Sequence, residues 1–283
     1  MLSLHTNNAA LSAQNSITRT QNQLSTSMTR LSTGFRINSA MDDAAGLQIA
    51  TRLKAQTSGM TVAMSNTQNS TSMLQTAEGA FDEVTNMLIR MKDLATQAAD
   101  ASSGAKDKTA MQSEYDALGL ELSNVMKNTT FGGNKLLVGG TLASSMTFQI
   151  GASQSETMAF DVSAKMTSLV ASLTSATANY AATAGGSELT GSANATIALL
   201  ETAIGDVGTV RSALGAAANR LDHVNTNLSN IATNTKAATG RIMDVDFATE
   251  SSNMTSSQML LQAGTAMLKQ SNSMSSMVMS LLQ

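Results

Sequence analysis

The chain has 283 residues and a formal net charge of −3, and its charged residues make up 13% of the sequence against about 25% in typical soluble domains. It contains no Cys and no Pro, which excludes a disulfide framework, a cysteine-based zinc site and a thiol nucleophile. It also lacks a basic stripe with aromatic platforms, which argues against a nucleic-acid partner. Aromatic residues make up 3%, so aliphatic side chains and 20 Met must fill the core, which favours narrow seams between helices.

The first predicted helix covers residues 3–31 and has no charged residue before Arg19. Its apolar side chains recur along one face, at Leu4, Leu11, Ile17, Leu24 and Leu31. The pattern stops at Gly34, a residue type that commonly ends helices. The start of the chain has no basic segment followed by an apolar run, so we expect no secretory signal peptide. No apolar run approaches the roughly 18 residues that span a bilayer, so we expect no membrane insertion.

A hinge is expected after Gly34. Ser39 stands three residues before Asp42, a spacing typical of a capping box, and Asp42 and Asp43 place negative charge at a helix start. A long second helix follows to about residue 102, and a third runs back over residues 111–126 to a turn at 128–133. Residues 146–150 and 157–162 alternate in polarity around a Gly- and Ser-containing turn and predict a β-hairpin.

Residues 163–191 are rich in Ser, Thr and Ala, and we expect a short variable surface insertion there with at most a short helix. Apolar residues then recur at spacings of 3 and 4 over residues 197–231, which is the pattern of a coiled coil. A short connection through Asp244, Asp246 and Phe247 leads into the tail.

The tail, residues 251–283, carries Lys269 as its single charged residue. One row of apolar side chains repeats every seven residues, at Leu260, Met267, Met274 and Leu281. Leu261, Leu268 and Leu282 lie beside that row. The opposite face carries Ser, Thr, Asn and Gln rather than ion pairs, so this helix needs neighbours on several sides. A disordered tail is the alternative, but disordered tails are usually charged or Pro-rich and lack a period.

These patterns predict a mainly α fold of long antiparallel helices, with a coiled coil formed by the paired N- and C-terminal segments and a small β-hairpin region. We expect residues 1–40 and 244–283 to form a coiled-coil domain. A second, helical domain is expected to take residues 41–162, which include the hairpin, and residues 192–243. The insertion at 163–191 interrupts this second domain.

Two stretches carry a family resemblance. The first is RLSTGFRINSAMDDAAGLQIATRL at residues 30–53; the second comprises NRLDHVNTNL at 219–228, GRIMDVDFATESSNM at 240–254 and the final Leu281-Leu282. Both resemble bacterial flagellin, over residues up to about 140 and from about 192. The middle does not match, as expected of a segment that varies in length within that family.

The resemblance implies that residues 1–40 and 244–283 form an inner coiled-coil domain and that residues 41–162 and 192–243 form an outer helical domain. It also implies a structural subunit that polymerises into the flagellar filament for motility, outside the cell, and is exported unfolded by the flagellar type III apparatus. It implies no enzyme activity and no cofactor. The implied partners are other copies of the chain, a flagellar export chaperone on residues 253–283, and the filament cap and hook-associated proteins. The rival hypotheses are a hook–filament junction protein or another flagellin-like secreted assembly protein. A needle or translocator protein would leave the motif at residues 30–53 unexplained.

The resemblance also implies recognition of the monomer by toll-like receptor 5. In receptor-stimulating flagellins the matching positions are an Arg and a Leu in the long helix and a Glu in the next, here Arg90, Leu94 and Glu114. At about 100° per residue, Arg90 and Leu94 are expected on a flank outside the intramolecular core.

Catalytic chemistry finds little support in the sequence. His5 and His223 are the only histidines, which excludes a site with three histidine ligands and the H-E-x-x-H motif. The Gly pairs follow no phosphate-binding pattern. Asp42 and Asp43 form a pair of carboxylates, but their place at a helix start favours capping over acid–base work.

Overall fold

The computed structural model describes residues 7–181 and 185–280, and it divides into two compact units. Unit 1 comprises residues 1–57 and 233–283, and unit 2 comprises residues 58–232. The two longest helices, α2 (Ala44–Ala99) and α5 (Glu188–Met243), each contribute residues to both units. These divisions fall within helices, whereas the domain boundaries expected from the sequence lie in the connections at 40/41 and 243/244. Most of the described chain is helical, which confirms the predicted mainly α class.

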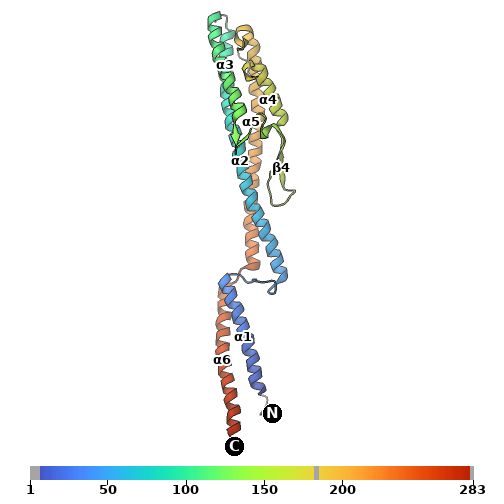
Figure 1. Cartoon of the computed structure of the whole chain (residues 1–283), viewed down its shortest axis with the longest axis vertical. Helices are drawn as coiled ribbons and strands as arrows, with labels where there is room; N and C mark the ends of the chain where they lie inside the picture. The colour runs from blue at the N-terminus through green and yellow to red at the C-terminus, as the bar shows by residue number, and fades with distance from the viewer. Residues whose placement is uncertain (1–6, 182–184, 281–283) are drawn as a thin grey trace. The chain divides into compact units, whose positions relative to one another are not determined.

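Unit 1 is built on α1 (Asn8–Thr33) and α6 (Phe247–Ser280), which lie side by side (Figure 1). Asn7 caps the start of α1, because its Oδ1 accepts a hydrogen bond of 3.1 Å from the Ala10 amide. Gly34 ends the helix with a left-handed φ of 77°, and its N–H donates to the Arg30 carbonyl. A residue with a Cβ would be strained in this conformation, so glycine suits the end of α1.

The two connections that follow α1 and precede α6 pair with each other. Phe35 and Asp244 form an isolated antiparallel bridge. The Arg36 amide donates to the Met243 carbonyl at 2.6 Å, and the Val245 amide donates to the Gly34 carbonyl at 3.0 Å. These backbone bonds tie together two segments that lie about 200 residues apart in the sequence.

The predicted capping box at Ser39 is replaced by a different arrangement. α2 begins at Ala44, and the Asp43 carboxylate caps it by accepting a hydrogen bond of 2.8 Å from the Gly46 amide. Asp42 instead accepts hydrogen bonds from the Ser39 and Asn38 amides, and these bonds hold the pKa of its carboxyl below the usual value. The Ser39 amide donates its hydrogen bond to the Asp42 carboxylate, and Ser39 does not cap the helix.

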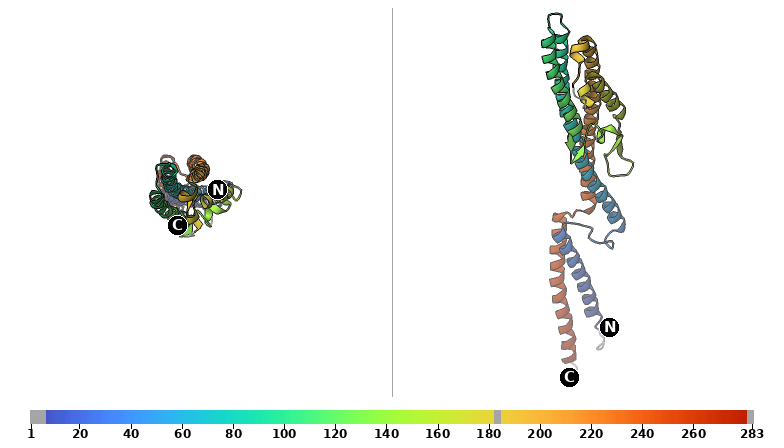
Figure 2. Two further views of the ribbon diagram at one scale, coloured as in Figure 1. Left: turned by 90° about the horizontal axis from the view of Figure 1, so that it is seen from above. Right: turned by 45° about the horizontal axis from the view of Figure 1, so that its top comes forward.

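Unit 2 packs the rest of α2 against α3 (Ala105–Asn128) and α5, and α3 follows α2 closely in both views (Figures 1 and 2). Most of the core is one cluster, in which Phe81, Val84 and Leu88 of α2 are fully buried. Tyr115 and Leu122 of α3 and Leu200 of α5 are also fully buried. A separate, smaller cluster comprises Met60, Ala63, Leu228 and Ala232. The repeat at spacings of 3 and 4 therefore faces this core over most of α5. Ser192 interrupts the start of α5 with non-helical angles.

Two small antiparallel strand pairs confirm the predicted β region. β1 (Thr130–Phe131) pairs with β2 (Asn134–Lys135), and β3 (Met146–Gln149) pairs with β4 (Thr157–Phe160). In the second pair Phe148 and Phe160 stack with ring centroids 6.2 Å apart. The inward positions of that hairpin add side chains to the core of unit 2, because alternate residues of a strand point to the same face.

Residues 163–191, expected as a surface insertion, contribute buried side chains instead. They form α4 (Ser163–Ala176) and the short 3₁₀ helix η2 (Ala178–Ala181), and the buried positions are Met166, Leu169, Leu173, Ala176 and Tyr180. Asn179 is 1% exposed and donates a hydrogen bond of 2.6 Å to Asp116 of α3. Part of this Ser- and Thr-rich stretch is therefore a layer of the core.

Tyr115 provides a test of that layer. Its hydroxyl donates a hydrogen bond of 2.7 Å to the Ala176 carbonyl at the end of α4, and burial raises the pKa of the phenol. A Tyr115→Phe change leaves the Ala176 carbonyl without its donor in a buried place, which is expected to cost about 1–3 kcal/mol of unfolding free energy. Denaturant unfolding followed by circular dichroism measures this loss. A matched Tyr180→Phe change removes a hydroxyl that is buried without a hydrogen-bond partner, and it should cost less.

Candidate assembly interface

The α1–α6 pair of unit 1 is a two-stranded coiled coil. Its seam, the row of residues on each helix that faces the other helix, contains many small side chains. On α6 the residues that face away from solvent are spaced by 4 and 3: Glu250, Met254, Ser257, Leu261, Gly264, Leu268 and Ser271. On α1 the corresponding series is Ala10, Ala13, Ile17, Thr20, Leu24, Ser27 and Leu31. Spacings of 3 and 4 place each series on one helix face, as in a heptad repeat.

Close approach of the two helices explains the small residues in the seam. A Cβ built on Gly264 would lie 2.9 Å from Cγ1 of Ile17, which is too close for an ordinary contact. Near the end of the pair, Nδ2 of Asn7 donates to Oγ of Ser271 at 3.2 Å. Small residues therefore let the two backbones come close together. The hydrogen bond between Asn7 and Ser271 links the start of α1 to α6.

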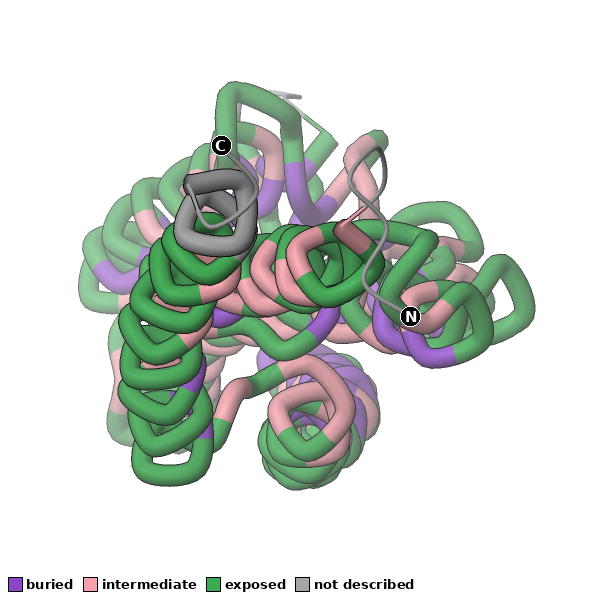
Figure 3. The backbone as a smooth tube through the Cα atoms, turned by 90° about the horizontal axis from the view of Figure 1, so that it is seen from below, coloured by how far each residue is buried: buried purple, intermediate pink, exposed green. Residues whose placement is uncertain are grey.

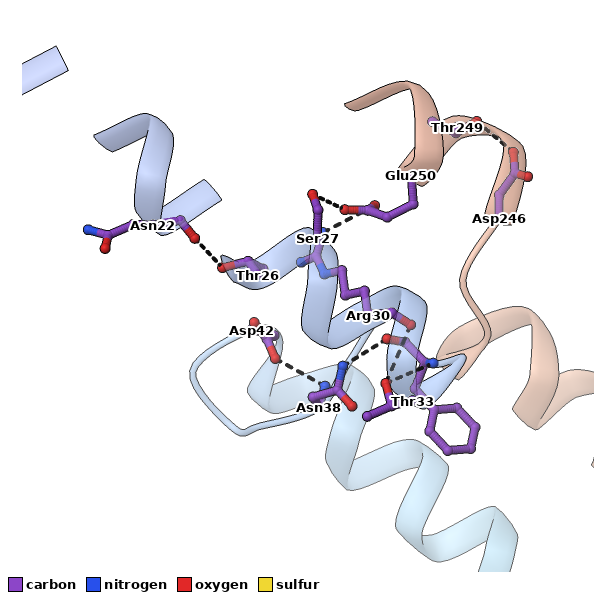
Figure 4. A network of polar contacts seen from close by, with 11 residues as sticks. Asn22, Thr26, Ser27, Arg30, Thr33, Asn38, Asp42, Asp246, Thr249 and Glu250 are labelled. Carbon is purple, nitrogen blue, oxygen red and sulfur yellow. Dashed lines mark hydrogen bonds and ion pairs between the residues drawn. The ribbon is translucent and has the colours of Figure 1, made fainter. Parts of the chain in front are cut away.

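A buried polar layer interrupts the apolar seam. Oγ of Ser27 donates a hydrogen bond of 2.5 Å to Oε1 of Glu250, and Nη1 of Arg30 lies 3.7 Å from Oε2 of the same carboxylate (Figure 4). Ser27 is 6% exposed and Glu250 is 7% exposed. A single polar layer of this kind favours one register of a coiled coil, because any slip leaves buried polar groups unpaired.

Glu250→Leu tests the layer. The change leaves the Ser27 hydroxyl buried without its acceptor and removes the partner of Arg30, and a loss of about 1–3 kcal/mol in unfolding free energy is expected. The double variant Ser27→Ala/Glu250→Leu replaces both polar partners by apolar groups and is expected to recover part of that loss. Thermal denaturation measures both, and a double variant no more stable than the single one would contradict the pairing.

The predicted assembly residues fall into two classes in the structure. Ile17, Leu24 and Leu31 are half-buried in the seam, whereas Leu11 is 48% exposed. Leu4 and Leu281 lie outside the described residues. The predicted tail row does not pack against α1: Leu260, Met267 and Met274 are 61%, 66% and 56% exposed. The expectation that this row is buried against the N-terminal helix as well as against neighbouring subunits is therefore wrong for the N-terminal helix, since Leu261 and Leu268 take the places that face α1.

We call Leu260, Met267 and Met274 the outer row. Other large apolar side chains of unit 1 are also exposed, namely Leu11, Met28, Phe35, Met41, Ile49, Phe247 and Met259. Figure 3 shows the helix that leads to the C-terminus as exposed along most of its described length. The only charged residues of α6 are Glu250 and Lys269, so the exposed apolar side chains have few charges around them. Such a surface is typical of a protein that associates.

Two of the three predicted receptor-binding residues are exposed, and the third is buried. Arg90 and Glu114 form an exposed ion pair with Nη2 and Oε1 2.6 Å apart, and their side chains are 55% and 47% exposed. Leu94 is 2% exposed and belongs to the core of unit 2. Its expected place outside the core was wrong, because α2 is packed over a wider arc than one narrow stripe. The structure brings Arg90 and Glu114 together, but it does not bring Leu94 to the surface that they form.

Within residues 7–181 and 185–280, no group of three or more potential metal-ligating side chains is found. None of the described helices is both long and apolar enough to cross a bilayer.

Comparison with known proteins gives matches at both ends of the chain. Residues 4–141 match the family described as "Bacterial flagellin N-terminal helical region", and residues 197–282 match "Bacterial flagellin C-terminal helical region". Polar flagellin F of Vibrio parahaemolyticus is 34% identical in an alignment that covers 99% of this chain and 99% of that protein. Flagellin A of Vibrio cholerae is 33% identical, with 100% of both chains covered.

Two solved structures are also similar. Bacillus cereus flagellin shares 30% sequence identity with a TM-score of 0.48, covering 62% of this chain and 94% of that one. A putative flagellar hook-associated protein from Vibrio parahaemolyticus has a TM-score of 0.58 at 16% identity, with coverage of 72% and 100%, and this likeness shows the fold alone. The two family matches and the whole-length identity to the Vibrio proteins agree with the helix pair described above. The chain therefore belongs to the bacterial flagellin family.

Proposed function

We propose that this flagellin assembles into the filament through the outer row and the exposed apolar side chains beside it. Bacterial flagellins are structural subunits of the flagellar filament, an extracellular part of the flagellum, and they are not enzymes. The observation that carries the proposal is the exposure of Leu260, Met267 and Met274 on a helix with two charged residues. A second copy of the chain is the partner that buries them.

Burial of the outer row against a neighbouring subunit favours assembly, because apolar surface is removed from water. Full burial of one Leu or Met side chain contributes about 1.5–3 kcal/mol, so three side chains of the outer row contribute several kcal/mol to each subunit added. The ordering cost of association takes part of this away. Long-range charge repulsion opposes it little, because the net charge is −3 in 283 residues.

Electron microscopy of the purified chain after salting out tests the proposal. Long filaments of uniform diameter are expected. Short caps or particles that never elongate would instead favour a hook–filament junction protein or another flagellin-like assembly protein. Filament cap and hook-associated proteins are proposed as partners at the two ends of the polymer.

We also propose export in an unfolded state by the flagellar type III apparatus. A chain without Cys cannot lock itself with a disulfide, and a chain without Pro has no slow prolyl step when it refolds. The proposed export chaperone holds residues 253–283 by apolar side chains that α6 leaves exposed. Calorimetry with a peptide of these residues tests this, and the absence of binding to the cognate chaperone would contradict it.

Recognition of the monomer by toll-like receptor 5 is proposed on a reduced set of residues. Arg90 and Glu114 offer an exposed, paired surface on α2 and α3, whereas Leu94 is buried in the core and is left out of the proposed contact. An Arg90→Ala change is expected to cost about 1–3 kcal/mol of receptor binding, as for an arginine that becomes buried at an interface.

A reporter-cell assay with depolymerised protein measures this loss. Lys92→Ala is a matched control. Lys92 is another cation of α2, but it pairs with Glu201 rather than with Glu114. A double variant Arg90→Ala/Glu114→Ala as potent as the unaltered chain would contradict the assignment.

A further inference from the structure

Methionines are distributed unevenly between the two units. Among the methionines whose burial the structure describes, every exposed one lies in unit 1: Met28, Met41, Met259, Met267 and Met274. Every buried one lies in unit 2: Met60, Met87, Met91, Met111, Met126, Met158 and Met166. The exposed group ranges from 53% to 95% exposure, and the buried group does not exceed 9%.

Burial decides which thioethers a dissolved oxidant can reach. A methionine of the first group has more than half of its surface open to water, whereas one of the second group is covered by its neighbours. Oxidation of methionine follows exposure, so the two groups should differ strongly in rate. Three of the exposed group, Met259, Met267 and Met274, lie on α6, and two of them belong to the outer row.

We propose that these three α6 methionines are an oxidation site through which peroxides control assembly. The thioether sulfur takes one oxygen atom from hydrogen peroxide: the O–O bond breaks, an S=O bond forms, the sulfur loses two electrons and the peroxide leaves as water. The product replaces an apolar side chain by a polar one with a strong acceptor oxygen. The inference rests on the proposed assembly through the outer row.

The effect on assembly follows from burial of the sulfoxide. An interface that fits a thioether offers no donor to the new oxygen, and burying an unpaired polar group is unfavourable. The monomer is therefore the sensitive species, and subunits within a filament are protected because their neighbours cover the same side chains. Reduction of the sulfoxides by the two stereospecific methionine sulfoxide reductases reverses the block.

The first measurement is selectivity. The depolymerised full-length chain is treated with hydrogen peroxide under native conditions, and a 16 Da mass gain is followed at each methionine by peptide mapping. The three α6 methionines are expected to react at least about tenfold faster than the seven buried ones. Preformed filaments should show little reaction at the same three positions. Equal reaction of exposed and buried methionines would overturn the proposal.

The second measurement is filament yield. The yield from the oxidised chain is expected to fall at least about tenfold and to recover after treatment with both reductases. The variant Met259→Leu/Met267→Leu/Met274→Leu is compared with its own untreated sample, and its yield should be nearly independent of peroxide. The matched control Met28→Leu/Met41→Leu removes the two methionines outside α6 that are exposed in the described part of the chain, and it should remain sensitive.

The outcomes separate this proposal from the proposed function. An untreated chain that forms no filaments overturns assembly through the outer row, and the oxidation switch with it. A fully oxidised chain that polymerises normally overturns the switch alone. A triple Leu variant that loses its yield in peroxide, or a Met28→Leu/Met41→Leu control that becomes insensitive, overturns the assignment to α6.

Discussion

Deletion of residues 262–283 is expected to leave a soluble helical monomer that forms no filaments. The deletion removes Met267 and Met274 of the outer row, together with Gly264, Leu268 and Ser271 of the seam. The remaining part of α6, residues 247–261, is close to the length at which an isolated helix is marginal in water. Each large apolar side chain lost removes about 2 kcal/mol from assembly or from the helix pair.

Sedimentation and electron microscopy measure the loss of polymer. The control is the core of unit 2, which lies in residues 58–232 and should keep its thermal transition. Normal filaments from the truncated chain would show that neither the outer row nor the end of the seam is needed.

The triple substitution Leu260→Ser/Met267→Ser/Met274→Ser is expected to have the largest effect of any change that leaves the seam in place. The three side chains are more than half exposed in the single chain, so their replacement should hardly change monomer stability. In the filament they are proposed to be buried, and losing about 2 kcal/mol for each should raise the critical concentration for polymerisation at least about a hundredfold.

Two further variants locate the effect on α6. Gln258→Ala/Thr265→Ala/Asn272→Ala changes exposed residues with the same spacing of seven on the same helix and should polymerise nearly as the unaltered chain does. Leu261→Ser/Leu268→Ser changes the seam instead and should lower the thermal stability of unit 1. If the outer-row variant melts early while the seam variant does not, the two faces of α6 have been assigned the wrong way round.

The sequence predicts the helices well because long periodic patterns face a continuous core. The hairpin of β3 and β4 was likewise predicted, since alternation over 146–150 and 157–162 has a turn between its two halves. The capping residue was not predicted correctly: Ser39 and Asp42 have the spacing of a capping box, but Asp43 is one residue closer to the helix and reaches the Gly46 amide.

The orientation of α6 could not be predicted from apolar spacing. The most apolar row repeats at Leu260, Met267 and Met274, whereas the row that contacts α1 contains Gly264 and two serines. Small residues allow the two helix backbones to approach closely. A search for apolar residues alone does not detect such a face. The Ser27–Glu250 layer was missed for a similar reason, although an isolated Glu in a tail with almost no charge was a signal for it.

Two surface predictions failed because the core of unit 2 is broader than one stripe per helix. Leu94 lies on the flank of the α2 stripe, but the packed arc of α2 includes that flank. Residues 163–176 have low sequence complexity, yet Met166, Leu169 and Leu173 are spaced by 3 and 4 and are buried together. Composition suggested a surface insertion with at most a short helix, whereas this short period is that of a helix packed on the core.

Site-specific labelling is the sharpest test of assembly through the outer row, because the chain has no Cys and a single introduced thiol is the only one present. Met267→Cys on the outer row and Ser155→Cys at the exposed turn between β3 and β4 are each treated with a maleimide, first as monomer and then after polymerisation. The thiol at 267 is expected to react readily in the monomer and at least about tenfold more slowly in the filament, while the thiol at 155 reacts in both. Equal labelling at 267 in monomer and filament would contradict assembly through the outer row.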